Sequence, residues 1–88
     1  MGSYLDKYGL RKGWIKMEEN KQLICNLLTV ALQATSGGWD LVSLTYHPAV
    51  KGVSGETVTV LFRNGYTKEV NVNLDSGTAM IKDIMKVF

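Results

Sequence analysis

Apolar and polar residues alternate through positions 57–74, and Asn64-Gly65 divides this stretch into two strands of a predicted antiparallel hairpin. A two-residue Asn-Gly loop would place the valines of the first strand on the same face as polar residues of the second. A three-residue loop, residues 63–65, removes this conflict because Val58 then faces Val70. We therefore predict the three-residue loop, with the glycine in the left-handed conformation that it adopts cheaply.

This register gives the hairpin two unlike faces. The apolar face is expected to hold the helices, and it comprises Val58, Val60, Phe62, Tyr66, Val70, Val72 and Leu74. Lys68 also lies on this face, at the margin of the sheet, where its stem can pack while its amine reaches water. The opposite face carries threonine, asparagine and glutamate with one leucine. We expect it to be solvated or to form a contact surface.

Residues 18–35 have the apolar spacing of a helix, which begins near Glu18 and Glu19 and ends before Gly37-Gly38. The apolar side chains of this helix spread over about half of its circumference, whereas a typical surface helix has a stripe about 100° wide. One three-stranded sheet would not cover so wide an arc. The rest of the arc requires a second helix, the N-terminal segment or another copy of the chain.

Residues 39–46 predict another strand. Val42, Leu44 and Tyr46 are expected on one face of it, and Trp39 and Leu41 on the opposite face. A proline at position 48 ends this strand because proline cannot donate to a ladder.

The segment that follows, residues 47–55, is longer than most hairpin connections and is therefore either mobile or functional. Asp75 or Ser76 is expected to cap the final helix. The predicted core stripe of this helix comprises Ile81, Ile84, Met85 and Phe88. Together these elements predict an α+β fold of the order αβββα, an antiparallel sheet with both helices on one face.

The chain has 88 residues, enough for one small domain, which we assign to residues 17–88. The single cysteine cannot form an internal disulfide, and with the single histidine it cannot build a four-ligand zinc site. We therefore expect a cytoplasmic protein with no metal and no cofactor. Cys25 is expected to be a small buried residue. No stretch is long enough to span a membrane, and no membrane partner is expected.

Charge is concentrated in residues 1–16, where four basic residues oppose one acidic residue and give a net charge of +3. Residues 17–88 carry −1. Met1-Gly2-Ser3 is typical of an expression leader, and the segment as a whole is either a flexible arm, an upstream extension before Met17, or an arm packed on the domain. A further alternative is a basic and aromatic arm that contacts nucleic acid. Its candidate contact residues are Arg11, Lys12, Trp14 and Lys16.

Candidate chemistry in the domain is sparse. His47 is the only histidine, and its neighbours in the sequence include no carboxylate at a useful spacing. His47 and Lys51 are candidate contact residues of the 47–55 loop, with no catalytic role assigned. The carboxylates show no acid–base pair or metal-ligand spacing, and the glycines form no phosphate-binding pattern.

The predicted element order resembles that of double-stranded-RNA-binding-like modules, and in particular HicA-type ribonuclease toxins. Two short motifs carry this resemblance, which covers residues 21–86 in outline: Gly38-Trp39-Asp40-Leu41-Val42, and Gly77-Thr78 with Ile81 and Ile84. The catalytic Gly-Ser-His of that family has no counterpart here, because His47 lies elsewhere. The lysine cluster on the last helix of RNA-binding modules is reduced to Lys82 and Lys86. The resemblance therefore supports the fold and argues against ribonuclease activity.

Three hypotheses follow from these patterns. The first is a small non-catalytic accessory protein, bacterial or from a phage, that acts through protein–protein contacts, with a homodimer as one form. The second is a nucleic-acid-binding accessory protein that uses its basic arm, with salt-dependent binding. The third, disfavoured by the missing motif, is a HicA-like ribonuclease that depends on His47.

Overall fold

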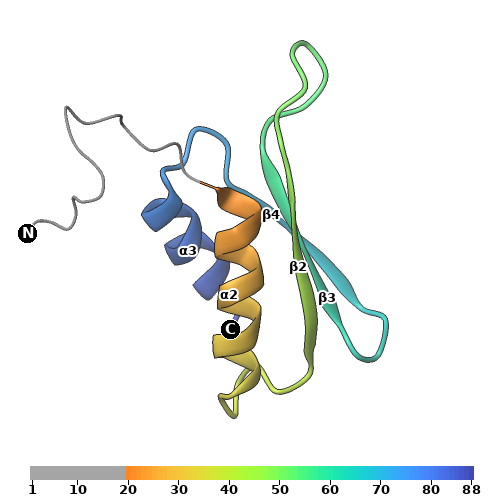
Figure 1. Cartoon of the computed structure of the whole chain (residues 1–88). Helices are drawn as coiled ribbons and strands as arrows, with labels where there is room; N and C mark the ends of the chain where they lie inside the picture. The colour runs from red at the N-terminus through yellow and green to blue at the C-terminus, as the bar shows by residue number, and fades with distance from the viewer. Residues whose placement is uncertain (1–19) are drawn as a thin grey trace, which may run out of the picture.

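The computed structural model describes residues 20–88, which form two helices and a three-stranded antiparallel sheet (Figure 1). The elements in chain order are α2 (Lys21–Gln33), β2 (Leu41–His47), β3 (Thr57–Phe62), β4 (Thr67–Asn71) and α3 (Gly77–Met85). Both helices lie on the same side of the sheet. The predicted α+β fold and its element order are confirmed.

Helix α2 is shorter than predicted and has a different N-cap. The side chain of Asn20 accepts a hydrogen bond from the backbone N–H of Leu23, at 2.9 Å, and so satisfies one of the free donors of the first turn. Glu18 and Glu19, which we expected at this end, lie outside the described residues. After the helix, the backbone passes so close to Leu32 that a Cβ on Gly38 would lie 2.5 Å from the Leu32 carbonyl oxygen. Only glycine fits there.

The sheet has the order β2-β3-β4, and the β3–β4 hairpin has the predicted register. Val58 pairs with Val70, and the N–H of Phe62 donates to the carbonyl of Tyr66 at 2.9 Å across the three-residue loop. Gly65 has a φ of 86°, as required at the last position of a loop of this type. The prediction of a bulged, three-residue loop is therefore confirmed.

Strand β2 departs from the predicted alternation because it contains a bulge. Leu41 pairs with Phe62, but Ser43 pairs with the neighbouring Leu61, which leaves Val42 as an extra residue. The extra residue turns Leu41 and Leu44 to the same side, where both are buried, while Val42 is 43% exposed. The prediction that Val42 shares a face with Leu44, opposite Leu41, was wrong for this reason.

Helix α3 begins at Ser76, whose hydroxyl accepts a hydrogen bond from the N–H of Ala79 at 3.2 Å, as one of the two predicted caps. Its buried residues are Gly77, Met80 and Ile84. Met85, expected in the core, is 44% exposed. The helix is therefore rotated relative to the predicted stripe, so that positions 80 and 84, spaced one turn apart, face the sheet.

The core lies between the sheet and the two helices. Its buried apolar residues are Cys25, Leu32, Leu41, Leu44, Val58, Val60, Val70, Val72, Met80 and Ile84. Two residues of the predicted apolar face are exposed instead. Leu74 is 89% exposed because the chain has left the strand and turns there with a φ of 63°. Tyr66 is 57% exposed and stacks on Phe62 beside the loop.

Candidate interaction surface

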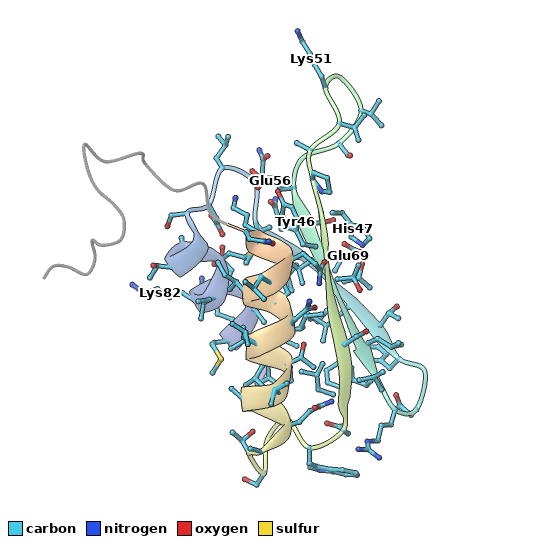
Figure 2. The ribbon with its side chains drawn as sticks, in the orientation of Figure 1. Tyr46, His47, Lys51, Glu56, Glu69 and Lys82 are labelled. Atoms are coloured by element: carbon cyan, nitrogen blue, oxygen red, sulfur yellow. The ribbon has the colours of Figure 1, made fainter. Side chains whose placement is uncertain are left out.

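A polar cluster joins the start of α2 to the sheet. Lys21 Nζ and the Tyr46 hydroxyl both donate to Oε1 of Glu56, at 2.6 and 2.7 Å. The backbone N–H of Leu74 donates to the other carboxylate oxygen at 3.0 Å, and Lys21 also donates to the carbonyl of Asp75 at 2.7 Å. These bonds connect Glu56 with three other segments: the start of α2, strand β2 and the β4–α3 connection. Figure 2 shows Glu56 and Tyr46 next to each other near the start of α2.

The cluster is largely shielded from water, since the side chains of Lys21 and Glu56 are 16% and 13% exposed. Hydrogen bonds from Lys21, Tyr46 and the Leu74 backbone lower the pKa of Glu56 to about 2. Burial, followed by the hydrogen bond to Glu56, raises the pKa of Tyr46 to about 12. Both carboxylate oxygens of Glu56 thus accept from fixed donors, so this cluster stabilises the fold and offers no free acid or base.

A second polar chain crosses the open face of the sheet. Nε2 of His47 lies 2.8 Å from Oγ1 of Thr59, and that hydroxyl donates to a carboxylate oxygen of Glu69 at 2.5 Å. A threonine hydroxyl has one hydrogen, and an ionised carboxylate can only accept. Nε2 of His47 must therefore be the donor to Thr59. The only histidine is consequently linked to a carboxylate through a hydroxyl.

This arrangement does not assemble a catalytic site within the described residues. His47 and Glu69 lie on the side of the sheet away from the helices (Figure 2). Thr59 shares this side, because its neighbours in β3, Val58 and Val60, are both buried under the helices. The chain His47–Thr59–Glu69 runs across three neighbouring strands, with Thr59 on the central strand β3. Such a chain can orient the imidazole and present its Nδ1 to a partner.

Of the remaining predicted contact residues, Lys51 lies in the described part of the chain, and it is not close to His47. Lys51 lies at the tip of the long β2–β3 connection, well away from His47 (Figure 2). There, Val50 bridges to Ser54 and Gly52 has a φ of 75°, so the tip is a tight turn and not an irregular loop. Arg11, Lys12, Trp14 and Lys16 lie outside the described residues.

Helix α2 presents an apolar stripe that the described residues leave uncovered. Cys25 and Leu32 face the core, whereas Leu23, Leu27 and Val30 are 50%, 63% and 66% exposed. The spacing of the exposed residues, i, i+4 and i+7, places them in one row along the helix. We call these three residues the α2 stripe.

Polar side chains of α2 also hold the sheet. The amide of Gln22 donates to the carbonyl of Leu44 at 3.2 Å, and its oxygen accepts from the N–H of Tyr46 at 2.8 Å. Gln33 donates to the carbonyl of Leu41 at 2.8 Å. The helix therefore turns two glutamines toward the sheet while three large apolar side chains point outward.

The sequence indicated part of this surface. The wide apolar arc of the first helix predicted that some of it would need a cover, but it did not identify which residues. Thr59 and Glu69 were placed on one face by the hairpin register, yet their link to His47 depends on the third strand. The Glu56 cluster includes an ion pair between residues 35 positions apart, and no local pattern points to it.

Within residues 20–88, no three His, Cys, Asp or Glu side chains lie close enough together to hold a metal ion. Neither of the described helices is long and apolar enough to cross a membrane. Comparisons of the chain with protein-family models, curated proteins and solved structures found no match.

Proposed function

We propose that this chain is a small non-catalytic interaction protein that binds another protein through the α2 stripe. The observation that carries the proposal is the exposure of Leu23, Leu27 and Val30 in one row, beside a core that is already closed. Rows of apolar residues at this spacing are the usual anchors of helix-mediated recognition. The bound surface is expected to be apolar as well.

The use of α2 favours binding over a purely structural role. A helix that served only to cover the sheet would direct its large apolar residues inward and its glutamines outward. Here Gln22 and Gln33 contact the sheet edge, and three large side chains remain half or more exposed among the described residues. A partner that covered them would remove apolar area from water, which is the main driving force of association.

Substitution of the stripe tests the proposal. The full chain, carrying an affinity tag, is expressed in its own cells as the wild type and as Leu27→Glu, and the proteins that copurify are compared. We expect a defined partner, which can include a second copy of the chain, to be lost with Leu27→Glu because a charge at the centre of an apolar contact must be desolvated.

The matched control is Lys82→Glu, which places a carboxylate at an exposed position of α3. This control should retain the partner. The same set of copurifying proteins with the wild type, Leu27→Glu and Lys82→Glu would contradict binding through the stripe. Circular dichroism of the purified variants shows whether each one is folded.

A further inference from the structure

Strand β4 is an edge strand of the sheet, and its outer backbone groups have no partner among residues 20–88. The bonds from Phe62 N–H to Tyr66 and from Val72 N–H to Glu56 show that even-numbered residues of this hairpin arm face β3. Because bonded and non-bonded positions alternate in an antiparallel pair, odd-numbered residues direct their N–H and C=O groups outward. These residues are Thr67, Glu69 and Asn71. Within residues 20–88, no hydrogen bond reaches their backbone groups from outside the strand.

The opposite edge of the sheet is treated differently. Gln22 accepts a hydrogen bond from the outward N–H of Tyr46 and donates one to the outward carbonyl of Leu44. Gln33 donates to the outward carbonyl of Leu41. Proteins protect edge strands in this way because a free edge is a template for another strand. The bulge in β2 adds to this protection. Strand β4 has neither a bulge nor a covering side chain among the described residues, so its edge is available for pairing.

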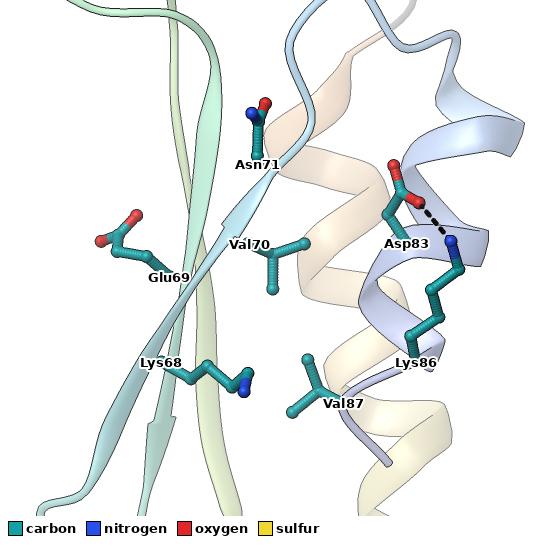
Figure 3. A pocket seen from close by; sticks show the side chains of 7 residues that line it. All are labelled: Lys68, Glu69, Val70, Asn71, Asp83, Lys86 and Val87. Atoms are coloured by element: carbon teal, nitrogen blue, oxygen red, sulfur yellow. Dashed lines mark hydrogen bonds and ion pairs between the residues drawn. The ribbon is translucent and has the colours of Figure 1, made fainter.

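A groove runs between this edge and helix α3 (Figure 3). Val70 and Val87 form its apolar floor, and Lys68 points across it toward the helix. On the other wall, Lys86 pairs with Asp83 at 3.2 Å. Glu69 also lines the groove, but its carboxylate turns to the open face of the sheet, where it accepts from Thr59. Counted over both faces, the β4 edge and its groove carry two lysines and two carboxylates, so this edge does not select a strongly acidic or basic partner.

We propose that β4 pairs antiparallel with β4 of a second copy of this chain, which joins two sheets into one of six strands. A two-fold interface brings the same surface of both copies together, so it must be self-complementary. An equal number of positive and negative side chains meets this condition, whereas a surface of one sign would repel its copy. The free N–H groups of one strand would donate to the free C=O groups of the other, and its C=O groups would accept in return.

The side chains indicate the register of this pairing. Glu69 opposite Glu69 of the second copy would place like charges together, which destabilises a strand pair. A shift that places Glu69 opposite Asn71 avoids this repulsion and preserves the outward backbone pairing of odd-numbered residues. Val70 then lies opposite Val70 of the second copy, on the face that bears the helices.

Proline at position 69 tests the pairing because it removes an outward N–H and leaves the ladder with β3 intact. In sedimentation equilibrium of the full chain, we expect a concentration-dependent dimer for the wild type. Glu69→Pro should weaken it roughly tenfold or more. Glu69→Ala, which keeps the N–H, should remain dimeric. A wild type that is monomeric at all concentrations, or a Glu69→Pro dimer of unchanged affinity, would overturn the proposal.

Amide hydrogen exchange of the wild-type chain provides a second test that needs no substitution. The amides of Thr67, Glu69 and Asn71 should exchange slowly at high protein concentration and faster on dilution. Fast exchange at every concentration, or protection that does not change on dilution, would overturn pairing with a second copy. Both tests are independent of the α2 stripe, because Leu27→Glu leaves the β4 edge unchanged and should retain this dimer.

Discussion

Glu56 shows how much of the fold depends on single polar contacts. Its carboxylate receives hydrogen bonds from a lysine on α2, a tyrosine on β2 and the backbone of the β4–α3 connection. The glutamines of α2 also hydrogen-bond β2, so the particular contribution of Glu56 is to tie both elements to the β4–α3 connection. If the carboxylate is removed, the Lys21 ammonium group loses its ion-pair partner while it remains poorly hydrated, and this destabilises the folded state. No short-range pattern in the sequence predicts this cluster, because its members meet only after the sheet has formed.

Stability should therefore fall in acid through Glu56. Its pKa is about 2 in the folded protein, below its ordinary value of 4.5, so folding favours the ionised form. The resulting stabilisation, at most about 3 kcal/mol, is present above pH 4.5 and is lost as the pH falls toward 2. Urea unfolding of the wild type and Glu56→Gln at pH 7, 4 and 3 measures it. The difference between the two proteins should shrink as the pH falls. A difference that does not vary with pH would contradict the assignment.

Gly65 is a residue whose role could be predicted from the sequence. The register of the hairpin required a left-handed residue at this position, and the φ of 86° confirms it. Gly65→Ala should lower the free energy of unfolding by about 1 kcal/mol, because alanine is strained there although no atom lies within 4 Å of its Cβ. Gly37→Ala is the matched control, since its Cβ also meets open space and its φ is not positive. Thermal unfolding should show a loss of stability for Gly65→Ala and none for Gly37→Ala.

At the scale of elements, alternation predicted the β3–β4 hairpin but not the course of β2. The hairpin is local, so its two faces could be aligned from the sequence. In β2, an extra residue at Val42 reverses the alternation and brings Leu41 to the core. The rotation of α3 was missed for a related reason. The apolar spacing of 80, 84 and 87 competes with that of 81, 84, 85 and 88, and only packing against the sheet decides between them.

The protection of the β2 edge by Gln22 leads to a prediction at this scale. Gln22→Met keeps a long side chain on the helix but removes both bonds to β2, so the Tyr46 amide loses its acceptor. We expect the free energy of unfolding to fall by about 1 kcal/mol. Hydrogen exchange of the Tyr46 amide should accelerate. The Thr45 amide, which faces β3, serves as an internal reference, and equal protection of Tyr46 in both proteins would show that Gln22 does not cover this edge.

The two faces of α2 should respond differently to substitution. Leu27→Gln should change the free energy of unfolding by less than about 0.5 kcal/mol, because the side chain is 63% exposed. Leu32→Ala should cost about 3 kcal/mol, because that side chain is 5% exposed and its loss leaves a cavity. Urea unfolding of the two variants gives both values. A loss of more than about 2 kcal/mol for Leu27→Gln would mean that the stripe contacts the chain's own residues.

At the scale of the molecule, the sequence predicted the architecture better than the surface. Element order and the single core follow from the periodicity of apolar residues, because this periodicity shows which side of each helix or strand is buried. The exposed stripe and the free edge of β4 are instead relations between segments: they depend on which side of α2 meets the sheet and on which strand lies at its margin. The wide apolar arc of residues 18–35 predicted that something must cover the helix. The structure narrows that region to Leu23, Leu27 and Val30.

The most direct test of binding through the α2 stripe is site-specific photo-cross-linking in the cells that express the chain. A photoreactive phenylalanine analogue replaces Leu27 in one variant and Asn64, at the exposed tip of the β3–β4 loop, in the control. After irradiation, mass spectrometry identifies each product. We expect a defined cross-linked protein from position 27 that is absent from position 64. The same products from both positions, or none from position 27, would contradict it.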